Sequence, residues 1–333
     1  MRSDSVLTSA SRGVPAAGAF FAATLQEVRS SDIKYQRNAS GAQIKLGGGN
    51  FGDVFKGRYE GAPVAIKQLR IETMSETDRA AFRSEATVHA RMRHPNIVNL
   101  LALCLEEGHF ALVLEYMEGG SLYQLLHSEI VLPWNQRIDM AMQLVAGVMY
   151  LHGLRDHIVH RDLKSANVLL ESPYNEHARV KLRIGDFGLA KIKDASSSTS
   201  GVGVAGTIVS SPPEAFDDTH VFTKKSDIYS LGVLLWEIAS RALPYAGLSM
   251  AALMRRILGG QTNPIPAGTP PEFASVIQDC WKLEPTERPD ARSLLPRLEV
   301  LAGFFAGRER AREREAAAPG AGAGSGMRPG STY

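Results

Sequence analysis

The feature that most constrains this chain is the polar run His160-Arg161-Asp162-Leu163-Lys164-Ser165-Ala166-Asn167, followed farther on by Gly185-Asp186-Phe187-Gly188. Asp162 supplies a carboxylate that can accept the proton of an attacking hydroxyl, and Lys164 stands where it can meet developing negative charge. Asn167 and Asp186 carry side-chain oxygens suited to holding Mg²⁺ against the phosphates of ATP. These residue types in this order indicate a phosphoryl-transfer centre.

The composition excludes several other classes of protein. The chain has 333 residues, of which 44% are hydrophobic and 22% charged, as in an ordinary globular protein. A net charge of +2 without a basic stripe argues against nucleic acid as a partner. The longest apolar stretches, such as residues 231–236, fall far short of the roughly 20 residues that cross a bilayer, so no membrane span is expected.

Cysteine usage bears on the compartment. Cys104 and Cys280 are the only two cysteines, and they lie far apart among apolar or aromatic neighbours. Such a pair indicates neither a disulfide framework nor a zinc site. We therefore expect a reducing, cytoplasmic compartment.

The chain divides into three parts by composition. Residues 1–35 are rich in Ser, Ala and Gly, and we expect a flexible N-terminal segment or a short docking helix there. Residues 36–305 carry all the motifs. Residues 306–333 begin with alternating Arg and Glu and end rich in Gly and Ala, which predicts a charged helical extension that gives way to disorder.

Two lobes are expected within residues 36–305, giving an α+β fold. Short β-branched runs with one helical stretch near residues 75–92 predict a small strand-rich lobe over about 36–117. Amphipathic stretches dominate residues 118–305 and predict a larger, mainly helical lobe. They run over 134–152, 225–240, 250–258 and 271–283. Because the chemistry is divided between the lobes, we expect them to share one cleft.

A glycine-rich run stands near the start of the first lobe. Gly47, Gly49 and Gly52 have the spacing that lets a backbone turn approach phosphates, although such a run alone is more often an ordinary turn. The strand pattern Pro63-Val64-Ala65-Ile66-Lys67 follows. Lys67 then stands where its ammonium could reach the α- and β-phosphates.

Lys67 needs a counter-charge, which Glu85 can supply. Phe82, Glu85 and His89 fall on one face of the predicted helix, and we expect that face to turn toward the cleft. The alternative is that Glu85 is an ordinary surface residue. Contact between Lys67 and Glu85 would mark the active arrangement.

In their order from Gly47 to Arg288, these motifs resemble the eukaryotic protein kinases. Residues 64–67, 115–122 and 280–289 most resemble the tyrosine-kinase-like group of serine/threonine kinases. The resemblance implies the bilobal kinase fold, ATP and Mg²⁺ as cofactors, and transfer of the γ-phosphate to Ser or Thr hydroxyls of protein substrates.

The resemblance also implies roles for individual residues. Catalysis would rest on Asp162, Lys164 and Asn167, supported by Lys67 and Glu85, with the metal held by Asn167 and Asp186. The residues implied to bind the nucleotide are Leu46, Gly47, Gly49, Gly52, Val54, Ala65, Lys67, Glu115, Met117, Leu169 and Asp186.

The adenine ring would sit at the connector between the lobes. By resemblance, the Glu115 carbonyl and the Met117 N–H would bond the ring, with Leu114 as the gatekeeper. Val54, Ala65 and Leu169 would sandwich the ring. The alternative is that this stretch is a plain interdomain turn with buried leucines.

Regulation and specificity are implied in the same way. Arg161 stands where many kinases receive a phosphate that an upstream activating kinase adds to the activation segment, here residues 186–214. Ser196–Ser200 and Thr207 are candidate acceptors, although a Ser run is also typical of a flexible loop. Thr207 and Lys164 are of the serine/threonine type.

Further contacts are implied in the second lobe. Glu214 in Pro212-Pro213-Glu214 would pair with Arg288, and Asp227 would anchor the backbone of the catalytic loop, residues 160–167. These three residues are interpreted as structural.

Three places depart from the family pattern. His89 stands where a bulky apolar residue is usual; if it is protonated there without a partner, the active arrangement is less favourable or pH-sensitive, and the alternative is a satisfied core histidine. Ser210 and Ser211 replace a pair that contains an aromatic residue, so the family pattern does not predict the substrate pocket here. Extra residues at 171–177 are interpreted as a longer hairpin tip facing away from the phosphates.

Two other functions stay open. A pseudokinase would use the fold as a nucleotide-binding scaffold, but the five residues that discriminate the two are intact, namely Lys67, Glu85, Asp162, Asn167 and Asp186. A kinase of small molecules or lipids is disfavoured by the complete activation segment.

Overall fold

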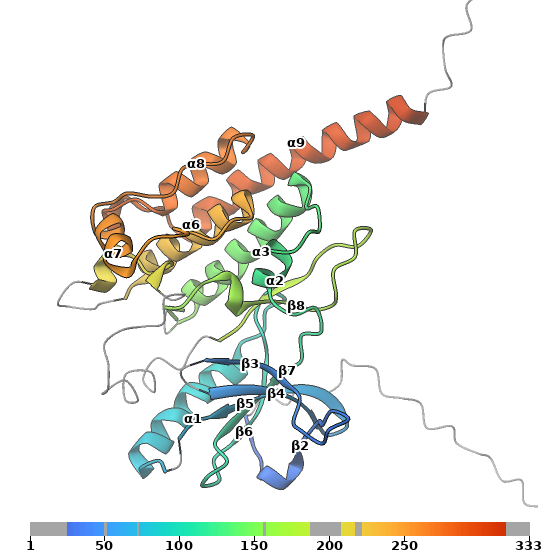
Figure 1. The fold of residues 1–333 in the computed structure, drawn as a ribbon, viewed down its shortest axis with the longest axis vertical. Helices are drawn as coiled ribbons and strands as arrows, with labels where there is room; N and C mark the ends of the chain where they lie inside the picture. Colours follow the sequence, from blue (N-terminus) through green and yellow to red (C-terminus); the bar gives the residue numbers. More distant parts are fainter. Residues whose placement is uncertain are drawn as a thin grey trace, which may run out of the picture. The chain divides into compact units, whose positions relative to one another are not determined.

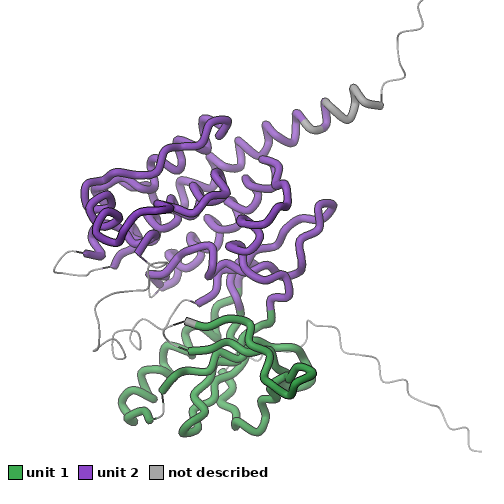
Figure 2. The backbone as a smooth tube through the Cα atoms, viewed as in Figure 1, with its two compact units in different colours: residues 1–93, 99–116, 191–196 green, residues 94–98, 117–190, 197–333 purple. Residues whose placement is uncertain are grey.

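The computed structural model describes residues 25–49, 52–71, 73–155, 158–186, 208–216 and 222–317. The chain divides into two compact units (Figure 2). Unit 1 comprises residues 1–93, 99–116 and 191–196, and unit 2 comprises residues 94–98, 117–190 and 197–333. Unit 1 is rich in strands and unit 2 in helices, so the prediction of a two-lobed α+β fold is confirmed.

Unit 1 is built on a seven-stranded sheet whose path runs β1-β6-β7-β5-β4-β2, with β3 paired to β4. All the pairings are antiparallel except that of β1 with β6. The strands are β1 (Gln26–Glu27), β2 (Ile33–Tyr35), β3 (Lys45–Gly49), β4 (Gly52–Tyr59), β5 (Ala62–Leu69), β6 (Leu100–Cys104) and β7 (Ala111–Glu115).

One face of this sheet carries an apolar core. In β5, Val64 and Ile66 are fully buried, and they cluster with Ala102 of β6 and Val113 of β7. Side chains alternate between the two faces of a strand, so Ala65 and Lys67 point to the opposite face. The alternation of side chains along β5 therefore places the core residues on one face of the sheet and Lys67 on the other.

Helix α1 (Glu76–Arg91) accompanies the sheet and packs near β6 (Figure 1). Its start is fixed by Ser75, whose side chain accepts a hydrogen bond from the Asp78 N–H at 3.1 Å, as is common at helix N-caps. The buried residues of α1 are Phe82, Ala86, His89 and Ala90. This single buried stripe explains why the helix was predictable at 75–92.

The N-terminal boundary differs from the expectation of a flexible segment reaching residue 35. Residues 26–27 form β1 and residues 33–35 form β2, with the 3-10 turn η1 (Ser30–Asp32) between them. The Val28 N–H donates to the Leu103 carbonyl at 2.8 Å, and Ile33 joins the core. Pairing with strands that are distant in the sequence orders this stretch. A Ser-rich composition does not predict such pairing.

Unit 2 is organised around helix α6 (Lys224–Ser240), which is buried along almost its whole length and packs on α3 and α8 (Figure 1). The other helices are α2 (Leu122–Leu126), α3 (Trp134–Gly153), α7 (Met250–Leu258), α8 (Pro271–Cys280) and α9 (Ala291–Ala317). The short 3-10 turns are η2 (Ser165–Asn167), η3 (Pro213–Phe216) and η4 (Pro285–Glu287). A hairpin of β8 (Val168–Leu170) and β9 (Leu182–Ile184) completes the unit.

Helix α9 continues beyond residue 305, where the kinase-like part of the chain was expected to end, as far as Ala317. This agrees with a helical start to the charged extension, whereas residues 318–333 lie outside the described residues. Among the helices of the described ranges, none combines the length and apolar character needed to cross a membrane.

Candidate active site

Several residues of unit 1 that were predicted to contact the nucleotide share one face of the sheet. Val54 of β4 lies directly opposite Lys67 of β5, and Gly47 of β3 lies opposite Val54. Ala65 lies opposite Leu114 of β7. Residues directly opposite in an antiparallel pair present their side chains on the same face, so this register groups Val54, Ala65 and Leu114 with Lys67.

The glycines of the β3–β4 turn have different local requirements. A Cβ at Gly52 would lie 2.0 Å from the Gln68 carbonyl oxygen, so the close approach of β5 demands glycine there. A Cβ at Gly47 would meet nothing within 4 Å. Packing in the described protein does not explain Gly47, which is compatible with backbone kept bare for a ligand. Asn50 and Phe51, at the tip, lie outside the described residues.

Lys67 and Glu85 both lie in unit 1, on β5 and α1. The Lys67 side chain is buried, with 6% of the residue exposed, and Glu85 is half-buried. Burial of a lysine is costly unless its ammonium group is paired or hydrogen-bonded. A buried lysine is therefore typical of a functional site. Their pairing stays a prediction.

In unit 2, the connector that follows β7 is bonded to the β8 strand. The Gly119 N–H donates to the Leu170 carbonyl at 3.1 Å, and the Leu170 N–H donates to the Gly120 carbonyl at 2.9 Å. Ser121 also bridges to Leu169. Met117 is buried and Leu169 half-buried, and both lie in unit 2. Their contact with adenine stays a prediction.

The catalytic loop brings three predicted residues into direct contact. The Lys164 ammonium lies 2.9 Å and 3.0 Å from the two carboxylate oxygens of Asp162. The Asn167 side-chain amide donates to the Asp162 carbonyl at 2.7 Å and to its Oδ2 at 3.0 Å. Asp162 is therefore held in a fixed orientation by two charged or dipolar groups, as a general base must be.

The β8–β9 hairpin brings Asn167 and Asp186 together. Asn167 precedes β8, and the Gly185 N–H after β9 donates to the Asn167 carbonyl at 2.8 Å. The extra residues at 171–177 lie at the opposite end of the hairpin, between the two strands. The interpretation of this insertion as a longer hairpin tip is confirmed, and the tip lies at the end of the hairpin away from Asn167 and Asp186. That it faces away from the phosphates stays a prediction.

The donor set of Asn167 and Asp186 fits Mg²⁺. Because the Asn167 Nδ2 faces Asp162, its Oδ1 is the atom that would bind a cation. An amide oxygen and a carboxylate are hard oxygen ligands, and Mg²⁺ usually combines one or two such ligands with phosphates and water. Asp186 has a left-handed backbone with φ of 60°, a conformation that Asp tolerates better than most residues.

Hydrogen bonds anchor the catalytic loop to a buried carboxylate on α6. Asp227, which is 1% exposed, accepts hydrogen bonds from the backbone N–H groups of His160 at 2.8 Å and Arg161 at 2.9 Å. Arg161 has a φ of 67°, so these bonds offset a strained backbone. The predicted anchoring role of Asp227 is confirmed. Sequence reasoning missed His152, whose Nε2 lies 2.8 Å from Asp227 Oδ2, because nothing local to α3 reports this contact.

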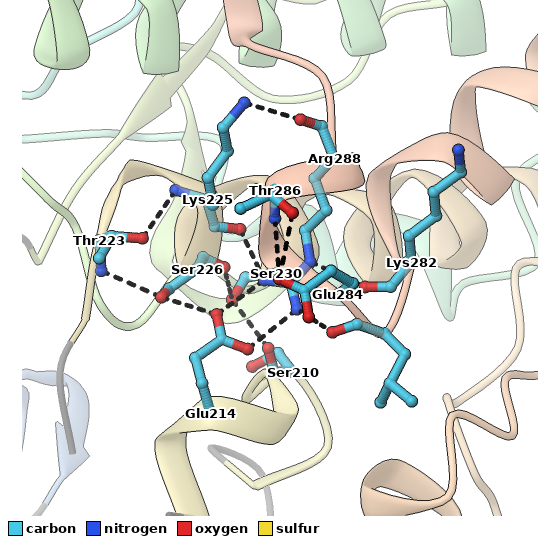
Figure 3. A network of polar contacts seen from close by, with 11 residues as sticks. Ser210, Glu214, Thr223, Lys225, Ser226, Ser230, Lys282, Glu284, Thr286 and Arg288 are labelled. Carbon is cyan, nitrogen blue, oxygen red and sulfur yellow. Dashed lines mark hydrogen bonds and ion pairs between the residues drawn. The ribbon is translucent and has the colours of Figure 1, made fainter. Parts of the chain in front are cut away.

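The pair predicted between Glu214 and Arg288 is confirmed. The two guanidinium NH groups of Arg288 donate to the two carboxylate oxygens of Glu214 at 2.7 Å and 2.9 Å (Figure 3). Ser226 of α6 adds a hydrogen bond to Glu214 at 2.9 Å. Burial by itself would raise the pKa of Glu214, but the hydrogen bonds from Arg288 and Ser226 hold that pKa below its usual value.

Arg288 is also tied to the surrounding backbone, as Figure 3 shows. It is 1% exposed and donates to the carbonyls of Lys282, Leu283 and Lys225. Each nitrogen of this guanidinium thus donates at least one hydrogen bond, and a buried charge requires such partners. Ser210 is held in the same region of unit 2 through its carbonyl, which accepts from the Ser230 hydroxyl of α6 at 2.8 Å.

Several predicted residues fall outside the described ranges. These are Phe187 and Gly188, which follow Asp186, the candidate phosphate acceptors Ser196–Ser200, and Thr207. The roles assigned to them stay predictions.

Comparison with known proteins agrees with this geometry. Residues 42–298 match the protein tyrosine and serine/threonine kinase family. The chain belongs to the protein kinase family. The matched residues of the kinase domain include both the sheet of unit 1 from β3 onward and the catalytic loop of unit 2.

Relatives of this kinase domain carry related names. It is 38% identical over 280 residues to the probable serine/threonine-protein kinase DDB_G0267514 of Dictyostelium discoideum, covering 83% of this chain and 29% of the relative. It is 36% identical over 285 residues to human mitogen-activated protein kinase kinase kinase 11, covering 84% of this chain and 32% of the relative. The probable serine/threonine-protein kinase drkD of D. discoideum is 33% identical over 275 residues, covering 82% of this chain and 20% of the relative. The chain spans less than a third of each of these three relatives.

Proposed function

We propose that this protein is an ATP-dependent protein serine/threonine kinase of the tyrosine-kinase-like group. The observation that carries the proposal is the Asp162 carboxylate, oriented by Lys164 and Asn167 within a loop that α6 anchors. The names of the relatives support serine/threonine specificity, and Lys164 is the residue that kinases of this type place beside the base.

In this proposal the reaction depends on positioning and charge. Asp162 accepts the proton of a substrate Ser or Thr hydroxyl, and Lys164 stabilises negative charge on the transferred group. Mg²⁺ held through Asn167 and Asp186 would neutralise charge on the phosphate oxygens of ATP. Lys67, with Glu85 as its partner, orients the α- and β-phosphates, and the face of Val54 and Ala65 covers the adenine.

The same proposal extends to regulation and location. Arg161 would receive a phosphate placed on the activation segment by an upstream kinase, since its backbone is held by Asp227 and its side chain is exposed.

We place the reaction in the cytoplasm, because the two cysteines are buried as free thiols. No nucleic-acid partner is proposed.

The test is transfer of labelled phosphate from ATP to the protein itself and to a generic basic protein, with and without Mg²⁺. We expect label on Ser or Thr that is lost when a chelator removes the metal. Label on Tyr alone would contradict the proposed specificity. ATP binding without any transfer, after treatment with candidate upstream kinases, would instead favour the pseudokinase alternative.

A separate prediction concerns His89. This residue is buried in the last turn of α1, with 7% exposed. We propose that an apolar side chain at this place favours the active arrangement, so for His89→Leu we expect basal transfer to rise about two-fold to ten-fold. His109→Leu, an exposed histidine of the same unit, is the matched control. Unchanged activity in His89→Leu would show that His89 is an ordinary core residue.

A further inference from the structure

The catalytic loop has a second attachment to α6 besides Asp227. The Ser165 hydroxyl donates to the Glu237 carboxylate oxygen Oε1 at 2.7 Å. Ser165 is 3% exposed and Glu237 is 5% exposed, so water does not compete for this hydrogen bond. Ser165 stands between Lys164 and Asn167, which both contact Asp162.

The same carboxylate oxygen has a second partner. His127, at the C-terminal end of α2, places its Nε2 2.9 Å from Glu237 Oε1. Burial raises the pKa of Glu237, while the hydrogen bonds from Ser165 and His127 oppose that rise. The two donors therefore offset part of the cost of burying an acidic group, and they fix where its oxygen lies.

Asp227 and Glu237 lie on one helix, about 15 Å apart along its axis at 1.5 Å per residue. Asp227 holds the beginning of the catalytic loop through His160 and Arg161, and Glu237 holds its end through Ser165. Almost every residue of α6 between them is buried, so the helix is a rigid support. Two carboxylates at a fixed separation on α6 therefore hold the two ends of the loop.

We propose that Glu237 is a positioning residue for phosphoryl transfer, which, through Ser165 and with His127 as its second donor, fixes Lys164 and Asn167 against Asp162. This rests on the proposed kinase function. Among the described residues, the side-chain hydrogen bonds of Glu237 join it to Ser165 and His127, neither of which is predicted to bind ATP, and its effect reaches the reaction through the loop backbone. Small displacements of such groups are costly, since misplacement by about 1 Å can lower a rate by about 100-fold.

The first test is Ser165→Ala, which removes the donor without adding volume. We expect kcat to fall about 10-fold while the KM for ATP changes by less than about three-fold, because the loop geometry and not nucleotide binding is altered. Hydrogen exchange at the amides of residues 164–167 should accelerate. Thr269→Val is the matched control, because it removes a hydroxyl that donates at 2.7 Å to the Pro266 carbonyl, away from the loop.

Variants of the carboxylate separate geometry from general stability. Glu237→Gln keeps an oxygen that can accept from Ser165, so we expect it to restore most of the kcat that Glu237→Ala loses. In the Ser165→Ala background, Glu237→Ala should cause no additional loss, as expected of residues that act as one unit. An additive loss would mean that Glu237 acts by another route, and would overturn the proposal.

The remaining outcomes are also decisive. Wild-type kcat in Ser165→Ala overturns the proposal, as does an equal loss in Ser165→Ala and Thr269→Val. These results leave the kinase assignment untouched, provided that the wild-type protein transfers phosphate and Asp162→Asn does not. Absence of transfer by the wild type would instead count against the proposed function itself.

Discussion

Replacement of Asp162 by Asn lowers the rate of phosphoryl transfer by about 100-fold to 10,000-fold, the range expected when a positioned general base is lost. The amide keeps the shape of the carboxylate, and it can still accept from Asn167 Nδ2, which lies 3.0 Å away. It cannot take up a proton from the substrate hydroxyl, and it no longer neutralises the Lys164 ammonium. The loss should therefore fall on kcat, with ATP affinity retained.

The measurement is a steady-state assay with labelled ATP, accompanied by a direct nucleotide-binding titration. Asp290→Asn is a suitable control, because it makes the same change of charge at a side chain that is 75% exposed and paired with Lys225. The control should retain wild-type kcat. A rate for Asp162→Asn equal to that of the control would remove Asp162 from the reaction and reopen the scaffold alternative.

The second large effect is on stability. Arg288→Ala should lower the free energy of unfolding by about 3–5 kcal/mol, because it leaves the partly buried Glu214 carboxylate without its counter-charge. The Arg288 side chain is fully buried and that of Glu214 is 16% exposed, so water compensates little of the loss. Three backbone carbonyls lose a donor in the same variant.

Chemical denaturation of the wild type and the variant measures this difference. Arg179→Ala provides the contrast within unit 2, since Arg179 makes three hydrogen bonds of 2.7 to 3.1 Å to Asp139 but its side chain is 67% exposed. Exposed pairs contribute about 0–1 kcal/mol. If Arg288→Ala cost no more than Arg179→Ala, the buried pair would not be the structural tie that its geometry indicates.

The sequence was informative wherever a local pattern coincides with a local constraint. The helices near 75–92 and 134–152 were predicted to within a residue or two because their apolar residues recur at helical spacing. The contacts of Asp162 with Lys164 and Asn167 follow from residues close in the chain. The pair of Glu214 with Arg288 was also predictable, but only through resemblance, since no local signal joins residues so far apart.

Other contacts gave no such signal. The β1 strand is two residues long and both are exposed, so it lacks the alternation that marks a strand. His127 and His152 meet their carboxylates on α6 from other helices, which only tertiary packing brings near. A histidine at a helix end carries no mark of such a partner. These contacts require the folded structure, because the chemistry is distributed over distant segments.

The short strand β1 has a practical consequence for anyone producing this protein in recombinant form. The family match begins at residue 42, yet β1 covers the outer edge of β6, and β2 delivers Ile33 to the core. A fragment trimmed to the match would expose an unpaired edge, which invites self-association through strand pairing. The expression boundary that respects the fold therefore lies before Gln26.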